Sequence, residues 1–178
     1  MPTPMGHAIG GLAAAFFVNA LASRPRLSIS LLGACAAVAV SPDIDILFGS
    51  HRTYTHSIGA VAAATAVAWL VLRTTTLPAS ASAVALSAAY LSHLFLDWLG
   101  TDTSRPPGLM ALWPLSSSFY MSGVNLFGEV SRRYWLPAEF VLGNMRALAW
   151  ELVVLTPLLV AAWARWSKRT LAGNKEEA

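Results

Sequence analysis

Five long apolar segments divide this chain, at residues 6–23, 28–42, 56–73, 79–100 and 145–165. A helix needs about 20 apolar residues to cross the hydrocarbon core of a bilayer, within a range of about 17–25. The last three segments reach this length, whereas the first two are short and would span only when packed against the others. The sequence therefore predicts an all-α fold, a polytopic membrane helix bundle of about five helices.

The composition agrees with a lipid-covered protein. Hydrophobic residues make up 56% of the chain and charged residues 12%, whereas about 25% of a soluble domain is charged. The net charge of +3 would suit a nucleic-acid partner, but the basic residues are scattered at segment ends rather than gathered on one face. We expect membrane lipid as a partner and no nucleic acid, and leave the oligomeric state open.

We expect one membrane-embedded domain over residues 1–178. Within it, 1–100 would form four helices that carry the site, 101–144 an interfacial segment or lid, 145–166 the last membrane helix, and 167–178 a loose charged tail. Aromatic side chains with polar tips favour the membrane interface. Those of the interfacial segment are Trp113, Phe119, Tyr120, Phe127, Tyr134, Trp135 and Phe140.

The distribution of basic residues predicts an orientation. If the five helices alternate, residues 43–55 and 101–144 lie on the same side as the N-terminus. Seven Lys and Arg then lie on the opposite side, against five on this one. Because Lys and Arg favour the cytoplasmic side, we expect a cytoplasmic C-terminus and a site on the extracytoplasmic side.

All four histidines and the first three aspartates lie at segment ends. They occupy the start of the first segment, the end of the second, the start of the third and the last turns of the fourth. Alternating helices bring these four ends to one face of the bilayer. Imidazole nitrogens and carboxylate oxygens bind zinc and other first-row divalent ions, so a metal site is predicted there. The set is His7, Asp43, Asp45, His51, His56, His93 and Asp97.

The spacing within this set suggests different roles for its members. His93 and Asp97 are four residues apart and share one helix face. Thr101 continues that face, and could contact substrate, if the helix extends one more turn. Asp43 and Asp45 are only two residues apart, and we expect one to bind metal while the other supports it or acts as a base.

Two further residues could contact the substrate. The planar guanidinium of Arg52 suits a phosphate or carboxylate. Thr55 could hydrogen-bond to substrate, although a role as N-cap of the third segment is simpler. Each polar group also has a purely structural interpretation, as a helix-face ion pair, a polar helix stop or an interfacial loop.

Several motifs together resemble the YdjM-like family over about residues 1–120. Its members are bacterial inner-membrane proteins predicted to be metal-dependent hydrolases, some of them under LexA control. The resemblance implies an inner-membrane location and hydrolase activity. The motifs are His7, Ser41-Pro42-Asp43-Ile44-Asp45, His51-Arg52-Thr53-Tyr54-Thr55-His56-Ser57, Ser92-His93-Leu94-Phe95-Leu96-Asp97 and Leu112-Trp113-Pro114-Leu115-Ser116.

The order of these residues is also similar to a wider superfamily, the zinc-dependent phospholipases C and the S1/P1 nucleases. These all-helical enzymes cleave phosphoesters and carry further metal-binding residues after their His-x3-Asp pair. This chain has no histidine after His93, so we expect one or two ions, most simply zinc, with Asp43 or His51 as the candidate to complete the site. By this resemblance the metal ligands would be His7, Asp45, His56, His93 and the candidate bridge Asp97.

These expectations describe a membrane-bound metal-dependent hydrolase that cleaves a phosphoester of a lipid or lipid-linked substrate with a metal-activated water. Asp43 or His51 would be the base or support the metal ligands, and Arg52 would bind the phosphate. A divalent metal transporter is one alternative, but transport sites lie near the bilayer midplane and often accompany repeats, which this sequence lacks. A structural or sensor protein stapled by metal is the other, and requires a closed site.

Overall fold

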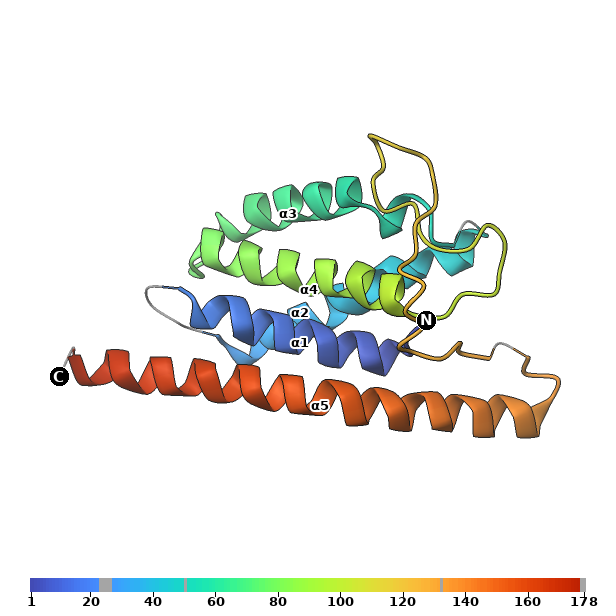
Figure 1. The fold of residues 1–178 in the computed structure, drawn as a ribbon. Coiled ribbons are helices and arrows are strands. Elements are labelled where there is room, and N and C mark those ends of the chain that lie inside the picture. Colours follow the sequence, from blue (N-terminus) through green and yellow to red (C-terminus); the bar gives the residue numbers. More distant parts are fainter. Residues whose placement is uncertain (23–26, 50, 132, 177–178) are drawn as a thin grey trace.

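The computed structural model describes residues 1–22, 27–49, 51–131 and 133–176. Over these residues it contains five α-helices, two short 3-10 helices and no strand. Figure 1 shows how the α-helices are arranged. The predicted all-α bundle is therefore confirmed. The helices are α1 (Pro4–Ala20), α2 (Ile29–Val40), η1 (Ser41–Phe48), η2 (Tyr54–His56), α3 (Ile58–Leu72), α4 (Ala79–Leu99) and α5 (Pro137–Glu176).

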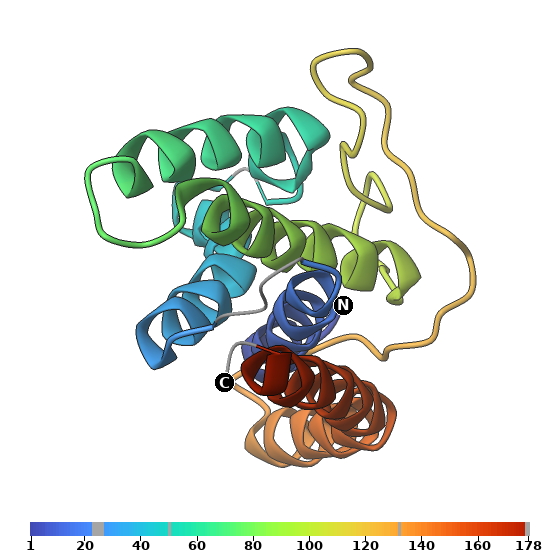
Figure 2. The same ribbon diagram turned by 90° about the vertical axis from the view of Figure 1, so that its left-hand side faces the viewer.

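Helix α1 lies at the centre of the bundle and packs against α2, α4 and α5 (Figure 2). Small residues permit this close approach, as is common between membrane helices. A Cβ added at Gly11 would collide with Ala39 of α2, and one added at Gly10 would collide with Leu96 of α4. The main buried cluster is correspondingly rich in alanine and comprises Ala15, Leu31, Cys35, Ala39, Ala85 and Ala89.

Three helical stretches are long and apolar enough to cross a membrane, judged by length and composition: Ile29–Phe48, Ala79–Leu99 and Pro137–Gly173. The second apolar segment was expected to end at residue 42, but the helical stretch continues to Phe48 because the 3-10 helix η1 follows α2 directly. The third segment is shorter than expected, since the α-helix begins only at Ile58 and has 15 residues. The expectation about which segments reach spanning length was therefore wrong for these two.

Helix α5 is much longer than the expected 145–166. It begins at Pro137, with Glu139 in its first turn, and continues to Glu176. A proline at the first position and an acid in the first turn both favour a helix start. Residues 137–144 thus belong to this helix rather than to the interfacial segment. The expected loose tail is also helical through Glu176.

The segment between α4 and α5 has little regular structure but is held to the end of α4. The Leu126 amide donates to the Leu99 carbonyl and the Thr101 amide to the Phe127 carbonyl, both at 2.8 Å. Phe127 is 1% exposed and packs with Leu96 and Leu155. Phe127 is therefore a core residue, not the interfacial anchor that the aromatic pattern predicted, whereas Tyr134 and Trp135 are exposed.

The Leu112-Trp113-Pro114 motif covers the start of α3. The amides of Ile58 and Gly59 donate to the carbonyls of Ala111 and Trp113, at 2.8 and 2.9 Å. A side chain at Gly59 would collide with Trp113 and Pro114. The motif thus satisfies the first amides of α3 and fixes the position of the loop that precedes this helix.

Candidate metal centre

Four segments far apart in sequence meet at one end of the bundle. The start of α1 supplies His7, η1 supplies Asp43, η2 supplies His56, and the last turns of α4 supply His93 and Asp97. The three histidines are fully buried and Asp97 nearly so. The alternating helices thus bring the predicted site residues together from opposite ends of the first hundred residues.

The centre of this cluster contains two imidazoles and two carboxylates. The Nε2 atoms of His56 and His93 are 3.0 Å apart, and Asp97 Oδ2 lies 3.4 and 3.3 Å from them. Asp43 Oδ1 lies 3.6 Å from His56 Nε2 and 3.8 Å from His93 Nε2. These four donor atoms all lie within 4.8 Å of one another, a spacing that could hold one metal ion.

The hydrogen bonds behind the two imidazoles direct lone pairs into the cluster. His93 Nδ1 lies 2.7 Å from the Ala39 carbonyl, and His56 Nδ1 lies 3.1 Å from a carboxylate oxygen of Asp45. Both partners only accept, so both Nδ1 atoms donate, and each neutral ring presents an Nε2 lone pair. Two lone pairs 3.0 Å apart require a positive charge between them.

The carboxylates around His56 stabilise such a charge. Burial alone would lower the pKa of His56, but the nearby carboxylates of Asp43, Asp45 and Asp97 raise this pKa to about 10. The same oxygens that hold a proton on the imidazole would bind a divalent cation. Metal and proton therefore compete for this position.

Buried atoms of His7 and Asp97 that lack hydrogen bonds also indicate a cation site. Neither ring nitrogen of His7 and neither side-chain oxygen of Asp97 makes a hydrogen bond to the described residues. His7 Nε2 instead lies 3.3 Å from Asp97 Oδ1, and its ring stacks on His93 at 3.7 Å. Buried polar atoms rarely lack a partner. The donor set, imidazole nitrogen and carboxylate oxygen, fits a first-row divalent ion.

Asp45 lies behind this cluster and orients two histidines. Its Oδ1 accepts from His51 Nδ1 at 2.8 Å, and its Oδ2 lies 3.1 Å from His56 Nδ1. The Arg52 amide and the Thr55 hydroxyl also donate to Oδ2, at 2.9 and 2.7 Å. Asp45, His51 and His56 form a second group with metal-binding spacing, but protein donors already occupy both oxygens of Asp45.

Arg52 pairs with Asp102, a residue that the sequence analysis did not identify. Its guanidinium forms an ion pair with Asp102 and donates to Ser104 Oγ at 2.8 Å. Arg52 is only 5% exposed, and its φ of 66° places a non-glycine residue in the left-handed region, where strain often accompanies function. The available signal was the position of Asp102, just after the polar end of α4.

The other two expected substrate residues differ in their surroundings. The Thr55 hydroxyl is occupied by Asp45, and the N-cap of α3 is Ser57, whose Oγ accepts from the Ala60 amide at 3.1 Å. Because α4 ends at Leu99, Thr101 does not continue the helix face that carries His93. Thr101 nevertheless lines a cavity beside the cluster.

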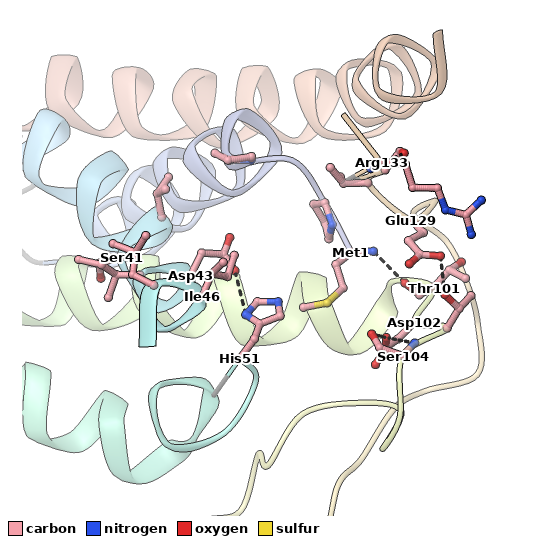
Figure 3. A pocket seen from close by; sticks show the side chains of 18 of the residues that line it. Met1, Ser41, Asp43, Ile46, His51, Thr101, Asp102, Ser104, Glu129 and Arg133 are labelled. Atoms are coloured by element: carbon pink, nitrogen blue, oxygen red, sulfur yellow. Dashed lines mark hydrogen bonds and ion pairs between the residues drawn. The ribbon is translucent and has the colours of Figure 1, made fainter. Parts of the chain in front are cut away.

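That cavity has a volume of about 1040 Å³ and reaches the cluster at Asp43; Figure 3 shows side chains that line it. Asp43 and His51 stand in its wall, opposite Thr101 and Asp102. Side chains of η1 such as Leu47 give it one apolar flank. Asp43, one of the four residues with metal-binding spacing, is therefore open to the cavity.

Comparison with known proteins places the chain in a family. The model of the YdjM inner membrane protein family matches residues 1–169. Neither the curated proteins nor the solved structures give a match. The match extends over nearly all 178 residues and includes every residue of the His and Asp cluster. The chain belongs to the YdjM inner membrane protein family.

Proposed function

We propose that this protein is a membrane-bound metal-dependent hydrolase that cleaves a phosphoester of a lipid or lipid-linked substrate. One observation carries the proposal: buried atoms of His7 and Asp97 lack hydrogen-bond partners among the described residues and converge with the facing Nε2 atoms of His56 and His93, beside an open cavity. Its family membership supports a location in the inner membrane, where lipid headgroups are the nearest phosphoesters.

The cluster would hold one or two divalent ions, with zinc the ion that best suits its donors. Asp43 takes the position expected for Asp45, since its Oδ1 faces both Nε2 atoms. Asp97 presents one oxygen to His7 and the other to His56 and His93, the arrangement that a bridging carboxylate needs. A bound divalent ion supplies Lewis acidity, lowering the pKa of a water and stabilising charge on a phosphoryl oxygen.

His51 is the residue best suited to accept and return a proton. Its Nδ1 donates to Asp45, so Nε2 of the neutral ring is the basic atom. His51 Nε2 makes no hydrogen bond to the described residues, and the residue lines the cavity. Asp45 thus positions the base through one oxygen and the metal-binding His56 through the other.

Arg52 fits a supporting role better than the phosphate contact that its sequence suggests. A phosphate would have to displace Asp102 from its guanidinium. The ion pair instead holds residues 101–104 as a wall of the cavity. Arg133 also lines the cavity, and its pairing with Glu139 is long, at 4.0 Å, and exposed. Arg133 is the cation that a substrate phosphate would meet first.

Metal analysis of the purified protein tests the site. We expect bound divalent metal in the wild type and its loss in His93→Ala. Ser92→Ala, the neighbouring position on α4 outside the cluster, serves as the matched control. Phospholipid and nucleotide substrates are then assayed with both variants. Metal content unchanged by His93→Ala would contradict the site assignment.

Reconstituted liposomes separate the hydrolase from its rivals. The proposal expects phosphate or headgroup release that depends on metal, without net ion movement. Metal flux without hydrolysis would instead show a transporter. Tightly held metal with neither activity would show a structural or sensor site.

A further inference from the structure

Helices α2 and α5 leave a groove between them. Both pack against α1, whereas the described residues of α2 and α5 make no comparable contact with each other. Viewed along the bundle in Figure 2, α2 and α5 flank α1 on two different sides. The gap between them is a cavity of about 580 Å³ that is open to the outside.

The lining of this groove is apolar. Phe16 of α1 contributes to its floor, Ile29, Gly33 and Ala36 of α2 form one wall, and Trp163 of α5 stands in the other. Among the residues that the structure describes, no charged side chain lines it. A Cβ added at Gly33 would meet nothing within 4 Å, so a large side chain at this position would have room to project into the groove.

The groove lies next to the cavity beside the metal centre. Ala36 lines the groove, while Ala37, the next residue of α2, and Val40, one turn further along, line the cavity that contains Asp43. From Ile29 to Val40 the helix rises about 17 Å at 1.5 Å per residue. This is close to half of a hydrocarbon core of about 30 Å. Both flanking helices belong to candidate membrane spans.

We propose that the groove between α2 and α5 binds one hydrocarbon chain of a bilayer lipid, whose headgroup lies in the cavity beside Asp43 and His51. An apolar groove at this depth faces acyl chains, and its polar end faces headgroups. The role of this lipid as substrate rests on the proposed function, whereas binding itself does not require turnover. A second copy of the chain would need to insert a helix into the groove, which the test below detects.

Photolabelling of the full-length protein tests this binding. The protein is reconstituted into phosphatidylethanolamine and phosphatidylglycerol vesicles that contain a phospholipid with a diazirine in its acyl chain, and labelled residues are mapped after illumination. Groove residues such as Phe16 and Trp163 should be labelled more strongly than Val67 and Leu70, which are exposed on α3.

Filling the groove should abolish this preference. In Gly33→Trp, and to a smaller extent in Gly33→Leu, groove labelling should fall to the level of the α3 positions. Gly33→Ala and the exposed α3 substitution Ala63→Trp should behave like the wild type. Unchanged metal content verifies that each variant is folded. Groove labelling equal to that of α3, or undiminished in Gly33→Trp, would overturn the proposal, as would crosslinks to a second copy at these residues.

Two substrates separate this inference from the hydrolase proposal. Gly33→Trp should lose hydrolysis of a long-chain phospholipid but keep that of a soluble short-chain phosphoester. Equal hydrolysis of both by wild type and variant would refute the groove while the hydrolase stands. Selective groove labelling in a protein that hydrolyses neither substrate would support lipid binding in the groove and refute the hydrolase proposal.

Discussion

At the scale of single residues, the carboxylate of Asp45 connects the candidate metal ligand His56 with the candidate base His51. An asparagine has one acceptor oxygen and one donor group, so Asp45→Asn leaves one imidazole without its acceptor. Removing such a supporting hydrogen bond costs about 10–100-fold in metal affinity. We expect this loss in chelator competition. Glu139→Gln, on an exposed carboxylate of α5, should leave the affinity unchanged, and equal affinities for both variants would contradict the role of Asp45.

A substitution of His51 tests whether this residue acts in turnover rather than in metal binding. His51→Gln should retain the metal, because the cluster of Asp43, His56, His93 and Asp97 remains complete. Turnover of a phosphoester should fall by about 10²–10⁴-fold, the usual contribution of general acid–base catalysis. Metal content and hydrolysis are measured on the same preparation. Loss of metal together with activity would make His51 a ligand rather than a base.

The pKa of His56, raised from 6.5 to about 10, sets a pH dependence for the metal-free protein. The protonated ring in its carboxylate surroundings contributes stability that is fully present below pH 6.5 and is lost as the pH rises through about 10. Thermal unfolding of chelator-treated protein in detergent should therefore shift down between pH 7 and 10. The shift should be smaller in His56→Gln; an equal shift in both proteins would assign it to other groups.

Sequence reasoning found the residues of the cluster but not their individual roles. The alternation of membrane helices is enough to bring His7 and His93 to the same side. The choice between Asp43 and Asp45 depends on the local turn, because the chain there forms the 3-10 helix η1, which the sequence analysis did not predict. Asp102 was missed because its partner Arg52 had been assigned to an external anion.

At the scale of elements, α1 depends on glycines that admit its neighbours. Leucine at Gly11 would collide with Ala39 and approach the Cys35 carbonyl. Gly11→Leu should therefore destabilise the bundle by about 1–3 kcal/mol, the usual cost of overpacking. Gly143→Leu provides the control, since nothing lies within 4 Å of its Cβ position. Unfolding in mixed detergent measures both, and equal stability of the two variants would contradict close packing at Gly11.

The elements themselves were only partly predictable. Hydropathy located every α-helix, because lipid requires long apolar runs. It missed the start of α5, where the aromatics Tyr134 and Trp135 suggested an interfacial segment, although Pro137 and Glu139 carry the local signals of a helix start. The polar last turns of α5 were also assigned to a loose tail, because hydropathy does not detect a helix that leaves the membrane.

At the scale of the whole molecule, α5 is long enough to cross a bilayer and to extend beyond the hydrocarbon core. Its 40 residues extend about 60 Å at 1.5 Å per residue, twice the thickness of the hydrocarbon core. Between Arg146 and Arg165 the only charged residue is Glu151, which is buried and accepts hydrogen bonds from Thr3. The stretch between the two arginines is therefore the part that fits the core.

This placement, together with the excess of basic residues on the side of the C-terminus, predicts an extracytoplasmic metal centre. Single cysteines can test it, because the native Cys35 is fully buried. Ser117→Cys lies in the exposed segment on the side of the cluster, and Thr74→Cys in the exposed turn after α3. With the outer membrane permeabilised and the inner membrane intact, a membrane-impermeant maleimide should label the first variant only. Lysis should expose the second, and the reverse pattern would place the metal centre in the cytoplasm.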